Sequence, residues 1–236
     1  DSICAFIHRV DPDIIDMQEV LHHQLEVLKT GLPEYTVVGV GREDGKTAGE
    51  YAPIFFKQAK YTLLDQNTFW LCEKPDSVGM VGWDAALTRI ATWVKLQDKK
   101  TGQILMVVNT HFDHIGTEAR RNSALLIIEK IKEIVGTSPA ILTGDFNVSE
   151  DWDAYKTITN NEFILKDAHK VAGKRTGVDF TYHNFGKIPA EKCEKIDFIF
   201  VTPQIRVISS YIPFSQLNDT LFLSDHNPEI VELEIK

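Results

Sequence analysis

The stretch AILTGDFN at residues 140–147 decides how the rest of the sequence is interpreted. Residues 140–143 form a short apolar run, which is typical of a buried strand, and the run ends in Gly144, Asp145, Phe146 and Asn147. Taken alone, these four residues predict a turn, because glycine, aspartate and asparagine each favour turns. The alternative is a polar cluster at the end of a strand, because strand ends are where pockets form in folds built on sheets.

Three other polar clusters follow apolar runs in the same way. They are Gln18-Glu19, residues 109–111 (NTH) and residues 224–226 (SDH). Singly, Glu19 predicts a carboxylate at a helix start, and residues 225–228 predict a polar turn before the last strand. The occurrence of all four clusters favours a shared site at the rim of the sheets.

Hydrophobic periodicity predicts more strands than helices. Helices are expected at the N-terminus and at residues 22–32, 118–135 and 152–159, with a long irregular loop at 69–83. Strands are expected at residues 13–18, 35–40, 53–57 and 61–64 (the last two as a hairpin), 89–97, 104–110, 140–143, 179–182, 196–201, 206–212 and 230–235. Few strands are separated by a crossover helix, so the pattern favours a mixed two-sheet α/β fold over a doubly wound parallel one.

Composition limits the class of protein. The 236 residues suit a single domain, and 43% hydrophobic residues can fill one core. The formal net charge of −9 disfavours a grip on long duplex nucleic acid, but a small or single-stranded phosphorylated substrate remains compatible with it. No apolar run reaches the roughly 18 residues of a membrane span. We expect a monomer, and the compartment is left open between the cytoplasm and export.

The motifs together resemble those of the endonuclease/exonuclease/phosphatase (DNase I-like) superfamily. The similarity lies, in family order, in DIIDMQEV (13–20), NTH (109–111), GDFN (144–147), IDFIF (196–200) and SDH (224–226). A bacterial subgroup is further suggested by GWDAA (82–86), RIATW (89–93) and THFDHIGTEAR (110–120). The resemblance covers nearly the whole chain and implies a four-layer α/β sandwich of two packed mixed β-sheets flanked by helices.

The resemblance also implies a metal-dependent hydrolase of phosphate esters, acting as a phosphodiesterase, nuclease or phosphatase. The expected metal is Mg²⁺, with Mn²⁺ as an alternative. Glu19 is the expected ligand, and Asp225 is expected to bind directly or through water. Hard cations of this kind take oxygen ligands, so one or two carboxylates and a substrate phosphate suffice.

Five further residues are assigned catalytic roles. Asp145 and Asn147, two apart on a segment expected to be extended, would hold the attacking water. His111 would donate to a non-bridging phosphate oxygen. His226 is the candidate acid/base, and Asp197 would orient its ring. Either Asp145 or His226 could accept the proton of the water.

Substrate-binding candidates come from the subgroup pattern and the long loop. Arg89, His114 and Arg120 match the pattern, and Trp83 lies in the loop expected at the mouth of the site. The competing interpretations are a solvated surface charge for Arg120 and a core position for Trp83.

The sequence departs from the family pattern at its start. The family begins with a strand that carries an asparagine near the metal, whereas this sequence opens in helical periodicity with Ile3, Phe6 and Ile7. We therefore expect the domain at residues 1–236 to be truncated at its N-terminus. Asp16 adds a carboxylate to an apolar strand, where it needs a partner.

Two other functions fit parts of the sequence pattern. Residues 110–116 resemble the latter part of the zinc-binding motif HxHxDHxG of metallo-β-lactamases, but Asn109 stands where the first histidine belongs. The other rival is a non-catalytic binding module of the same fold. That alternative predicts lost catalytic side chains, whereas Glu19, His111 and His226 are among those retained.

Overall fold

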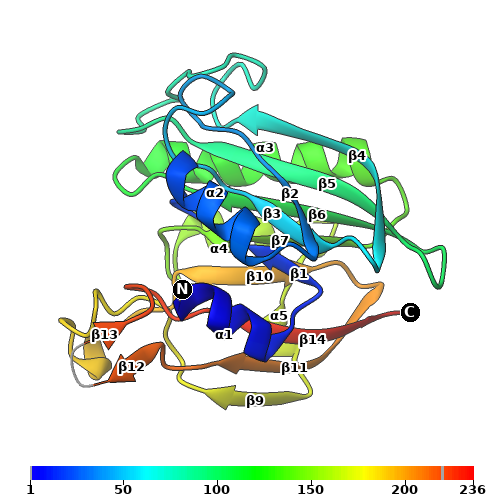
Figure 1. Ribbon diagram of the computed structural model, residues 1–236. Helices are drawn as coiled ribbons and strands as arrows, with labels where there is room; N and C mark the ends of the chain where they lie inside the picture. Colours follow the sequence, from blue (N-terminus) through cyan, green and yellow to red (C-terminus); the bar gives the residue numbers. More distant parts are fainter. Residues whose placement is uncertain (1, 219–220) are drawn as a thin grey trace.

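The computed structural model describes residues 2–218 and 221–236, which form layers of helix, sheet, sheet and helix (Figure 1). The helices are α1 (Ser2–Val10), α2 (His22–Gly31), α3 (Thr117–Val135), α4 (Asp153–Thr159), α5 (Ala168–Val171) and the 3-10 turn η1 (Ala190–Lys192). The strands are β1 (Ile14–Asp16), β2 (Tyr35–Val38), β3 (Ile54–Lys57), β4 (Tyr61–Trp70), β5 (Ile90–Asp98), β6 (Ile104–His111), β7 (Ala140–Asp145), β8 (Lys166–Asp167), β9 (Lys174–Gly177), β10 (Asp197–Val201), β11 (Ile205–Ile212), β12 (Gln216–Asn218), β13 (Leu221–Phe222) and β14 (Ile230–Ile235).

The largest sheet has six strands in the order β4-β5-β6-β7-β10-β8. Its named pairs are antiparallel except β6 and β7, which run parallel and are joined through α3. Parallel neighbours need a crossover of this kind, and both strands therefore end at the same edge of the sheet.

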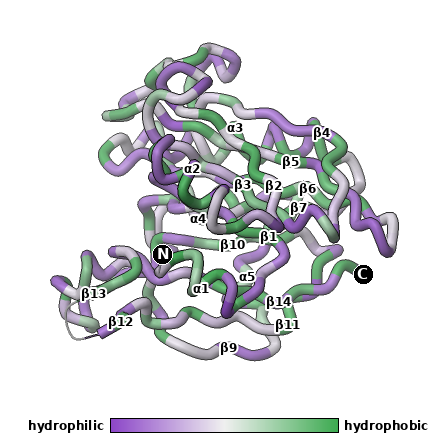
Figure 2. Tube along the Cα trace, in the orientation of Figure 1, coloured by the Kyte–Doolittle hydropathy of each residue, from purple (hydrophilic) through white to green (hydrophobic). Residues whose placement is uncertain are grey.

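Alternating side chains of the six-stranded sheet fill two cores. Trp93 and Val108 belong to the core shared with α3 and α4, whereas Val94 and Val107 belong to the core shared with the other β layer. Because successive strand residues point to opposite faces, one sheet buries both faces. Figure 2 shows hydrophobic segments through the middle of the fold and many hydrophilic ones in its outer loops.

The second β layer consists of two three-stranded sheets, β1-β3-β2 and β14-β11-β9. Within the part of the chain that the structure describes, β1 and β14 each pair with a strand on one side only. Their side chains, including Ile14, Val231 and Leu233, pack against the same inter-sheet core. Helices α1 and α2 cover the outer face, where Leu25 and Leu28 pack with Phe55.

The mixed α/β sandwich with packed sheets is as expected, but two local predictions are wrong. Residues 53–57 and 61–64 do not form a hairpin, because β3 pairs with β1 and β2 while β4 pairs with β5 in the other layer. No strand forms at residues 179–182, where Tyr182 makes isolated bridges to Glu194 and His226. None of the helices in the described residues is long and apolar enough to span a membrane.

Candidate active site

Strand register places three of the expected catalytic residues side by side. His111 is the last residue of β6, Asp145 is the last of β7, and Asp197 is the first of β10. Asp145 is the register partner of both His111 and Asp197. Three adjacent strands therefore present three polar side chains in one row at the same edge of the sheet.

His226, near the C-terminal end of the chain, lies beside this row of three residues. Tyr182 bridges to His226 through the backbone, which brings this residue to the sheet edge. The His226 Nδ1 lies 2.7 Å from Asp197 Oδ2, and its Nε2 lies 3.9 Å from Asp145 Oδ2. Asp197 thus holds the ring with the second nitrogen directed toward Asp145.

Glu19 reaches the row from the other β layer. Val20 and Tyr51 form an antiparallel bridge, which joins the segment that carries Glu19 to the segment that carries Glu50. Together with His111, these two carboxylates offer ligand atoms that all lie within 4.8 Å of one another. Glu19 has a left-handed backbone with φ of 59°, a conformation that costs energy and is enriched at functional sites.

The charges of the row are strongly perturbed. Burial raises the pKa of Asp145, and the charge of Asp197 raises it further. Burial alone would lower the pKa of His226, but the hydrogen bond and charge of Asp197 outweigh it and raise the pKa to about 9. Burial lowers the pKa of His111 well below its usual range, so this ring is neutral. His226 is therefore protonated and His111 is neutral, although both rings lie beside the Asp145 carboxylate.

The segment from Asp145 to Asn147 is a turn rather than the extended stretch that was expected. Asn147 has φ of 51°, and its backbone N–H donates to Asp145 Oδ1 at 2.9 Å. Its side-chain Nδ2 donates to the carbonyl oxygen of Phe112 at 2.9 Å. Asn147 thus fixes the Asp145 carboxylate through its backbone, and a contact of its side chain with water stays a prediction.

Asp225 lies next to the row but outside both ligand-distance groups found among the described residues, one formed by Glu19, Glu50 and His111 and the other by Asp145, Asp197 and His226. Its backbone oxygen accepts from the N–H groups of His183 and Asn184, and its charge raises the pKa of Glu19 after the effects of partial burial and of Glu50. A metal contact of Asp225 stays a prediction.

Arg89 and His114 form part of a wall beside His111. Arg89 is 4% exposed, and its Nη2 lies 3.1 Å from His114 Nδ1. The guanidinium group can only donate, so Nδ1 accepts and the other ring nitrogen of His114 carries the proton in this contact. Asp113 anchors the same wall, since its carboxylate accepts from several backbone N–H groups, among them that of Gly116 at 2.8 Å.

Arg120 and Trp83 occupy different surroundings. Arg120 is 5% exposed, donates to the carbonyl oxygen of Asp113 and lies over the Trp152 ring at 5.0 Å. The alternative of a solvated surface charge is therefore wrong. Trp83 is half-buried in the loop after β4 and has φ of 49°. Substrate contacts of both residues stay predictions.

Two residues of the site, Glu50 and Arg42, were missed from the sequence. Arg42 is 8% exposed, and its Nη1 lies 2.6 Å from Glu50 Oε2. Arg42 lies within the polar, glycine-containing segment 41–49, and Glu50 directly follows it. The signal available was Glu50 directly before the apolar run from Tyr51 to Ile54, a polar residue bordering a strand as in the other clusters.

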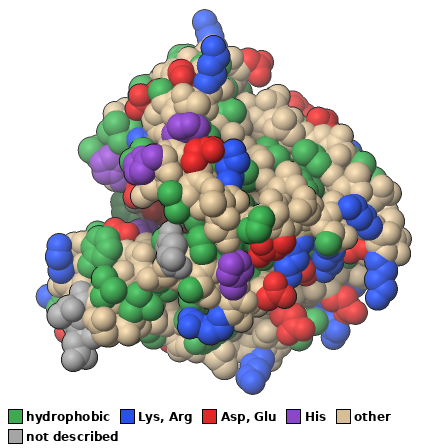
Figure 3. Space-filling model, viewed as in Figure 1, with side chains coloured by type: hydrophobic (Ala, Val, Ile, Leu, Met, Phe, Trp, Pro, Cys, Tyr) green, Lys and Arg blue, Asp and Glu red, His purple; other side chains and the backbone are tan. Residues whose placement is uncertain are grey.

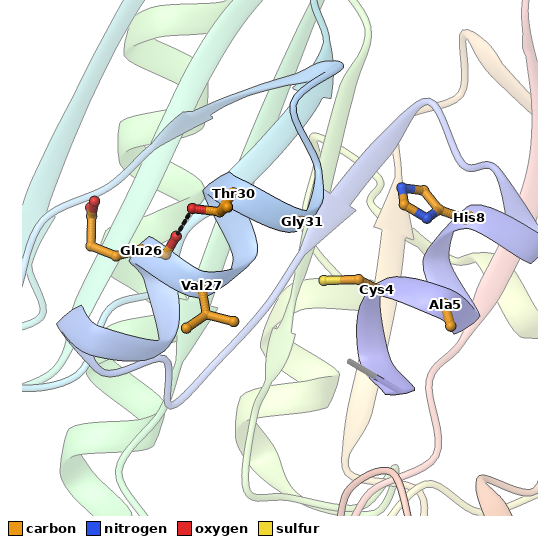
Figure 4. A pocket seen from close by; sticks show the side chains of 7 residues that line it. All are labelled: Cys4, Ala5, His8, Glu26, Val27, Thr30 and Gly31. Carbon is orange, nitrogen blue, oxygen red and sulfur yellow. Dashed lines mark hydrogen bonds between the residues drawn. The ribbon is translucent and has the colours of Figure 1, made fainter.

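A surface pocket between α1 and α2 lies away from this chemistry (Figure 4). In Figure 4 the side chains come from these two helices, and the dashed line marks the bond from Thr30 Oγ1 to the Glu26 carbonyl oxygen. The pocket is lined by Cys4, Ala5, His8, Glu26, Val27, Thr30 and Gly31. None of the site residues predicted from the sequence borders it.

Asn109 does not act as a zinc ligand would. Its Nδ2 donates to the carbonyl oxygens of Met17 and Pro53, and its Oδ1 accepts from Gln18 Nε2 at 2.7 Å. The buried amide thus ties β6 to the segment that carries Glu19. The metallo-β-lactamase alternative is wrong for this fold.

Comparisons with known proteins agree with this geometry. Residues 1–226 match the model of the Endonuclease/Exonuclease/phosphatase family. An endonuclease/exonuclease/phosphatase from Bacteroides vulgatus has 62% sequence identity and a TM-score of 0.97, covering 100% of this chain and 89% of that one. The mannosyl-6-phosphatase of Bacteroides thetaiotaomicron has 37% identity and a TM-score of 0.93, covering 99% and 90%.

A more distant structure shares the fold alone. The catalytic domain of human Nocturnin, solved with a bound sulfate anion, has 18% identity and a TM-score of 0.79, covering 99% of this chain and 84% of that one. The family match, the DNase I-like sandwich and the paired carboxylates and histidines lead to one conclusion. The chain belongs to the endonuclease/exonuclease/phosphatase family and is a phosphoesterase.

Proposed function

We propose that this chain is a Mg²⁺-dependent hydrolase of phosphate esters that works by in-line attack of water. The observation that carries the proposal is the row in which His226 pairs with Asp197 at 2.7 Å and faces Asp145, beside the Glu19 cluster. Phosphoryl transfer requires a positioned nucleophile, a proton for the leaving group and neutralisation of oxygen charge. The row and its neighbouring cluster offer a group for each requirement.

The carboxylates of Glu19 and Glu50, which lie beside His111, suit a hard divalent cation. Glu19 and Glu50 would hold the ion through carboxylate oxygens, which Mg²⁺ prefers and Mn²⁺ also accepts. Bound there, a divalent ion supplies charge neutralisation at the phosphoryl oxygens. His111 is uncharged because burial lowers its pKa, and its one remaining ring N–H can donate a hydrogen bond to a non-bridging oxygen.

The protonation states suggest a division of labour between Asp145 and His226. His226, whose pKa is raised to about 9, holds a proton at neutral pH and gives it from Nε2 to the leaving alcohol oxygen. Asp145 accepts the proton of the attacking water in its ionised form; because burial raises its pKa to about 8, this form is a strong base that becomes more populated as the pH rises above neutral. Asp197 stabilises the cationic ring, and the backbone of Asn147 holds the accepting carboxylate in place.

A small or single-stranded substrate fits the charge of the molecule. On the face shown in Figure 3, Lys and Arg are scattered among Asp and Glu and form no continuous basic stripe. The net charge of −9 also weakens binding to long duplexes. The related mannosyl-6-phosphatase supports phosphorylated sugars as the first substrates to try.

Turnover of a phosphate-ester panel, with and without Mg²⁺, tests the proposal. We expect Mg²⁺-dependent hydrolysis that falls by at least about a hundredfold in Glu19→Ala and in His226→Ala, because each removes a group used in the transition state. His23→Ala, which changes an exposed histidine on α2, serves as the matched control. Unchanged turnover in either site variant would overturn the mechanism.

A further inference from the structure

Two buried arginines lie against the cluster that would hold the metal. Arg42 is ion-paired at 2.6 Å to Glu50, whose carboxylate is one of the ligand-distance group with Glu19 and His111. The Arg42 guanidinium therefore contacts the cluster directly, through the carboxylate of Glu50. Arg42 and Arg89 come from loops far apart in the sequence, and the fold brings them within range of each other's charge.

The positive charge and the N–H donors of Arg89 are only partly matched by its neighbours. Its Nε contacts Asp113 Oδ1 at 3.4 Å, which is long for a charge-assisted bond, and its Nη2 donates to the uncharged acceptor His114 Nδ1. Its Nη1 is buried and has no hydrogen-bond partner within the described residues. A buried donor without a hydrogen-bond partner is unfavourable, so it calls for an explanation such as a ligand.

Asp113 is not a dedicated counter-ion for Arg89. Its two oxygens accept from the backbone N–H groups of Ala86, Leu87, Ile115 and Gly116 at 2.8–3.3 Å. Burial alone would raise the pKa of Asp113, but these backbone donors outweigh it and hold the pKa far below its usual range. The carboxylate therefore organises two loops, and the guanidinium retains unsatisfied positive charge.

The two guanidinium groups also lie close enough to affect each other. Burial lowers the pKa of Arg89, and the charge of Arg42 lowers it further. After burial, the charges of Arg89 and Arg42 are the largest influences that lower the pKa of His111. Two like charges held together in a protein wall favour the binding of an anion between or against them.

We propose that Arg42 and Arg89 form an anion subsite beside the metal position, which binds the free oxygens of a terminal dianionic phosphate and makes phosphomonoesters the substrate class. A monoester presents three non-bridging oxygens and up to two charges, whereas a diester presents two oxygens and one charge. Guanidinium groups match phosphate oxygens in geometry as well as charge. His114 offers its second ring nitrogen as a further donor at the open side of the subsite. This inference rests on the proposed function.

The test compares a monoester with a diester and measures inorganic phosphate directly. The full chain with Mg²⁺ is assayed on p-nitrophenyl phosphate and bis(p-nitrophenyl) phosphate, and phosphate is titrated both as an inhibitor and by calorimetry. We expect the wild type to prefer the monoester. Arg42→Gln and Arg89→Gln should each raise KM for the monoester and weaken phosphate binding at least about tenfold, which corresponds to about 1.4 kcal/mol. Diester turnover should fall by a smaller factor than monoester turnover, because a diester presents one fewer non-bridging oxygen and less charge to the subsite.

Controls separate local binding from folding. Arg206→Gln makes the same charge change at an exposed position on β11, where Arg206 pairs with Glu234, and should leave both substrates unaffected. Arg89→Lys keeps the charge and should retain part of the phosphate affinity. If Arg89→Gln unfolds, Arg42→Gln and Arg89→Lys still decide the outcome.

The failures of the two proposals are distinguishable. Unchanged phosphate binding and monoester KM in Arg42→Gln and in the folded Arg89 variant would overturn the subsite. A wild type that hydrolyses the diester better than the monoester would also overturn it, while the proposed function would stand. A wild type without Mg²⁺-dependent turnover of either ester would overturn the proposed function, and phosphate calorimetry would then decide the subsite by itself.

Discussion

The edge of the six-stranded sheet and the loops of the split β layer build the site by different means. At the sheet edge, His111, Asp145 and Asp197 are fixed by consecutive pairs of a hydrogen-bonded register. In the split layer, Glu19 and Glu50 are brought together beside one isolated bridge. Paired strands hold side chains more precisely than loops do. The comparison teaches that the proposed proton-transfer groups lie mainly in the more rigid region, whereas the proposed metal ligands lie in the more adaptable one.

The largest expected loss of activity comes from a substitution of Asp145, at the centre of the rigid region. Asp145→Asn removes the proposed base but can keep the turn to Asn147, because the amide oxygen still accepts from that N–H. We expect kcat on p-nitrophenyl phosphate with Mg²⁺ to fall about a thousandfold. Asp179→Asn, at a fully exposed side chain, should retain wild-type kcat. A loss smaller than about tenfold in Asp145→Asn would remove this carboxylate from the mechanism.

The adaptable region is tested at Glu50. Glu50→Gln takes one carboxylate from the ligand cluster and leaves Arg42 without its ion-pair partner. We expect the Mg²⁺ concentration for half-maximal activity to rise about 10- to 100-fold, as for other disrupted metal sites. Glu43→Gln changes an exposed residue of the same loop and should not shift the Mg²⁺ dependence. An unchanged Mg²⁺ requirement in Glu50→Gln would show that Glu50 does not serve the metal.

A pH profile sharpens the role of the Asp197–His226 pair. His226 must carry a proton to donate it, and with Asp197 present its pKa is raised to about 9. In Asp197→Asn the effect of burial is no longer outweighed by this charge, so the pKa of His226 should drop toward or below the usual value of about 6.5. We therefore expect the basic limb of the pH–kcat profile to move from about pH 9 to about pH 7 or lower. The same basic limb in wild type and Asp197→Asn would argue against His226 as the acid.

The smallest effect concerns stability where the two β layers meet. Asp16 on β1 accepts a hydrogen bond from Thr143 Oγ1 on β7 at 2.8 Å, and its Oδ1 is buried without a partner in the described structure. Burial raises the pKa of Asp16 from 3.8 to about 7. The unfolded chain ionises near 3.8, so this residue destabilises the fold increasingly from about pH 4 to 7 and fully above pH 7.

Asp16→Asn should therefore stabilise the protein only at the higher pH. We expect the unfolding temperature to rise by about 2–4 °C at pH 8 and by much less at pH 4.5, as measured by thermal unfolding. Asp179→Asn provides the exposed-residue control. An equal shift at both pH values would mean that the titration of Asp16 is not the cause.

Sequence patterns predicted the rigid region better than the adaptable one. An apolar run ending in polar residues identifies strand-end positions such as Asp145 directly, because the run itself forms the strand. Glu50 and Arg42 were not predicted because a glycine-containing polar loop shows no hydrophobic periodicity. Their position also depends on a bridge between Val20 and Tyr51, which are 31 positions apart in the sequence.

The incorrect strand predictions have similar physical causes. The short connection from Lys57 to Tyr61 suggested a hairpin, but the chain crosses there from one β layer to the other. Strand β9 was missed because all four of its residues, Lys174–Gly177, are exposed and show no hydrophobic alternation. Pairing partners of this kind are set by the tertiary fold and are not encoded in local sequence.

The most direct test of the account is a double-mutant cycle that joins the two regions. The value of kcat/KM for p-nitrophenyl phosphate with Mg²⁺ is measured in the wild type, Glu19→Ala, Asp145→Asn and the double variant. The account predicts that the double variant is no more than about tenfold worse than the poorer single variant, because residues that act as one unit are strongly non-additive. Losses that multiply in full would show that the two regions act independently and would contradict the account.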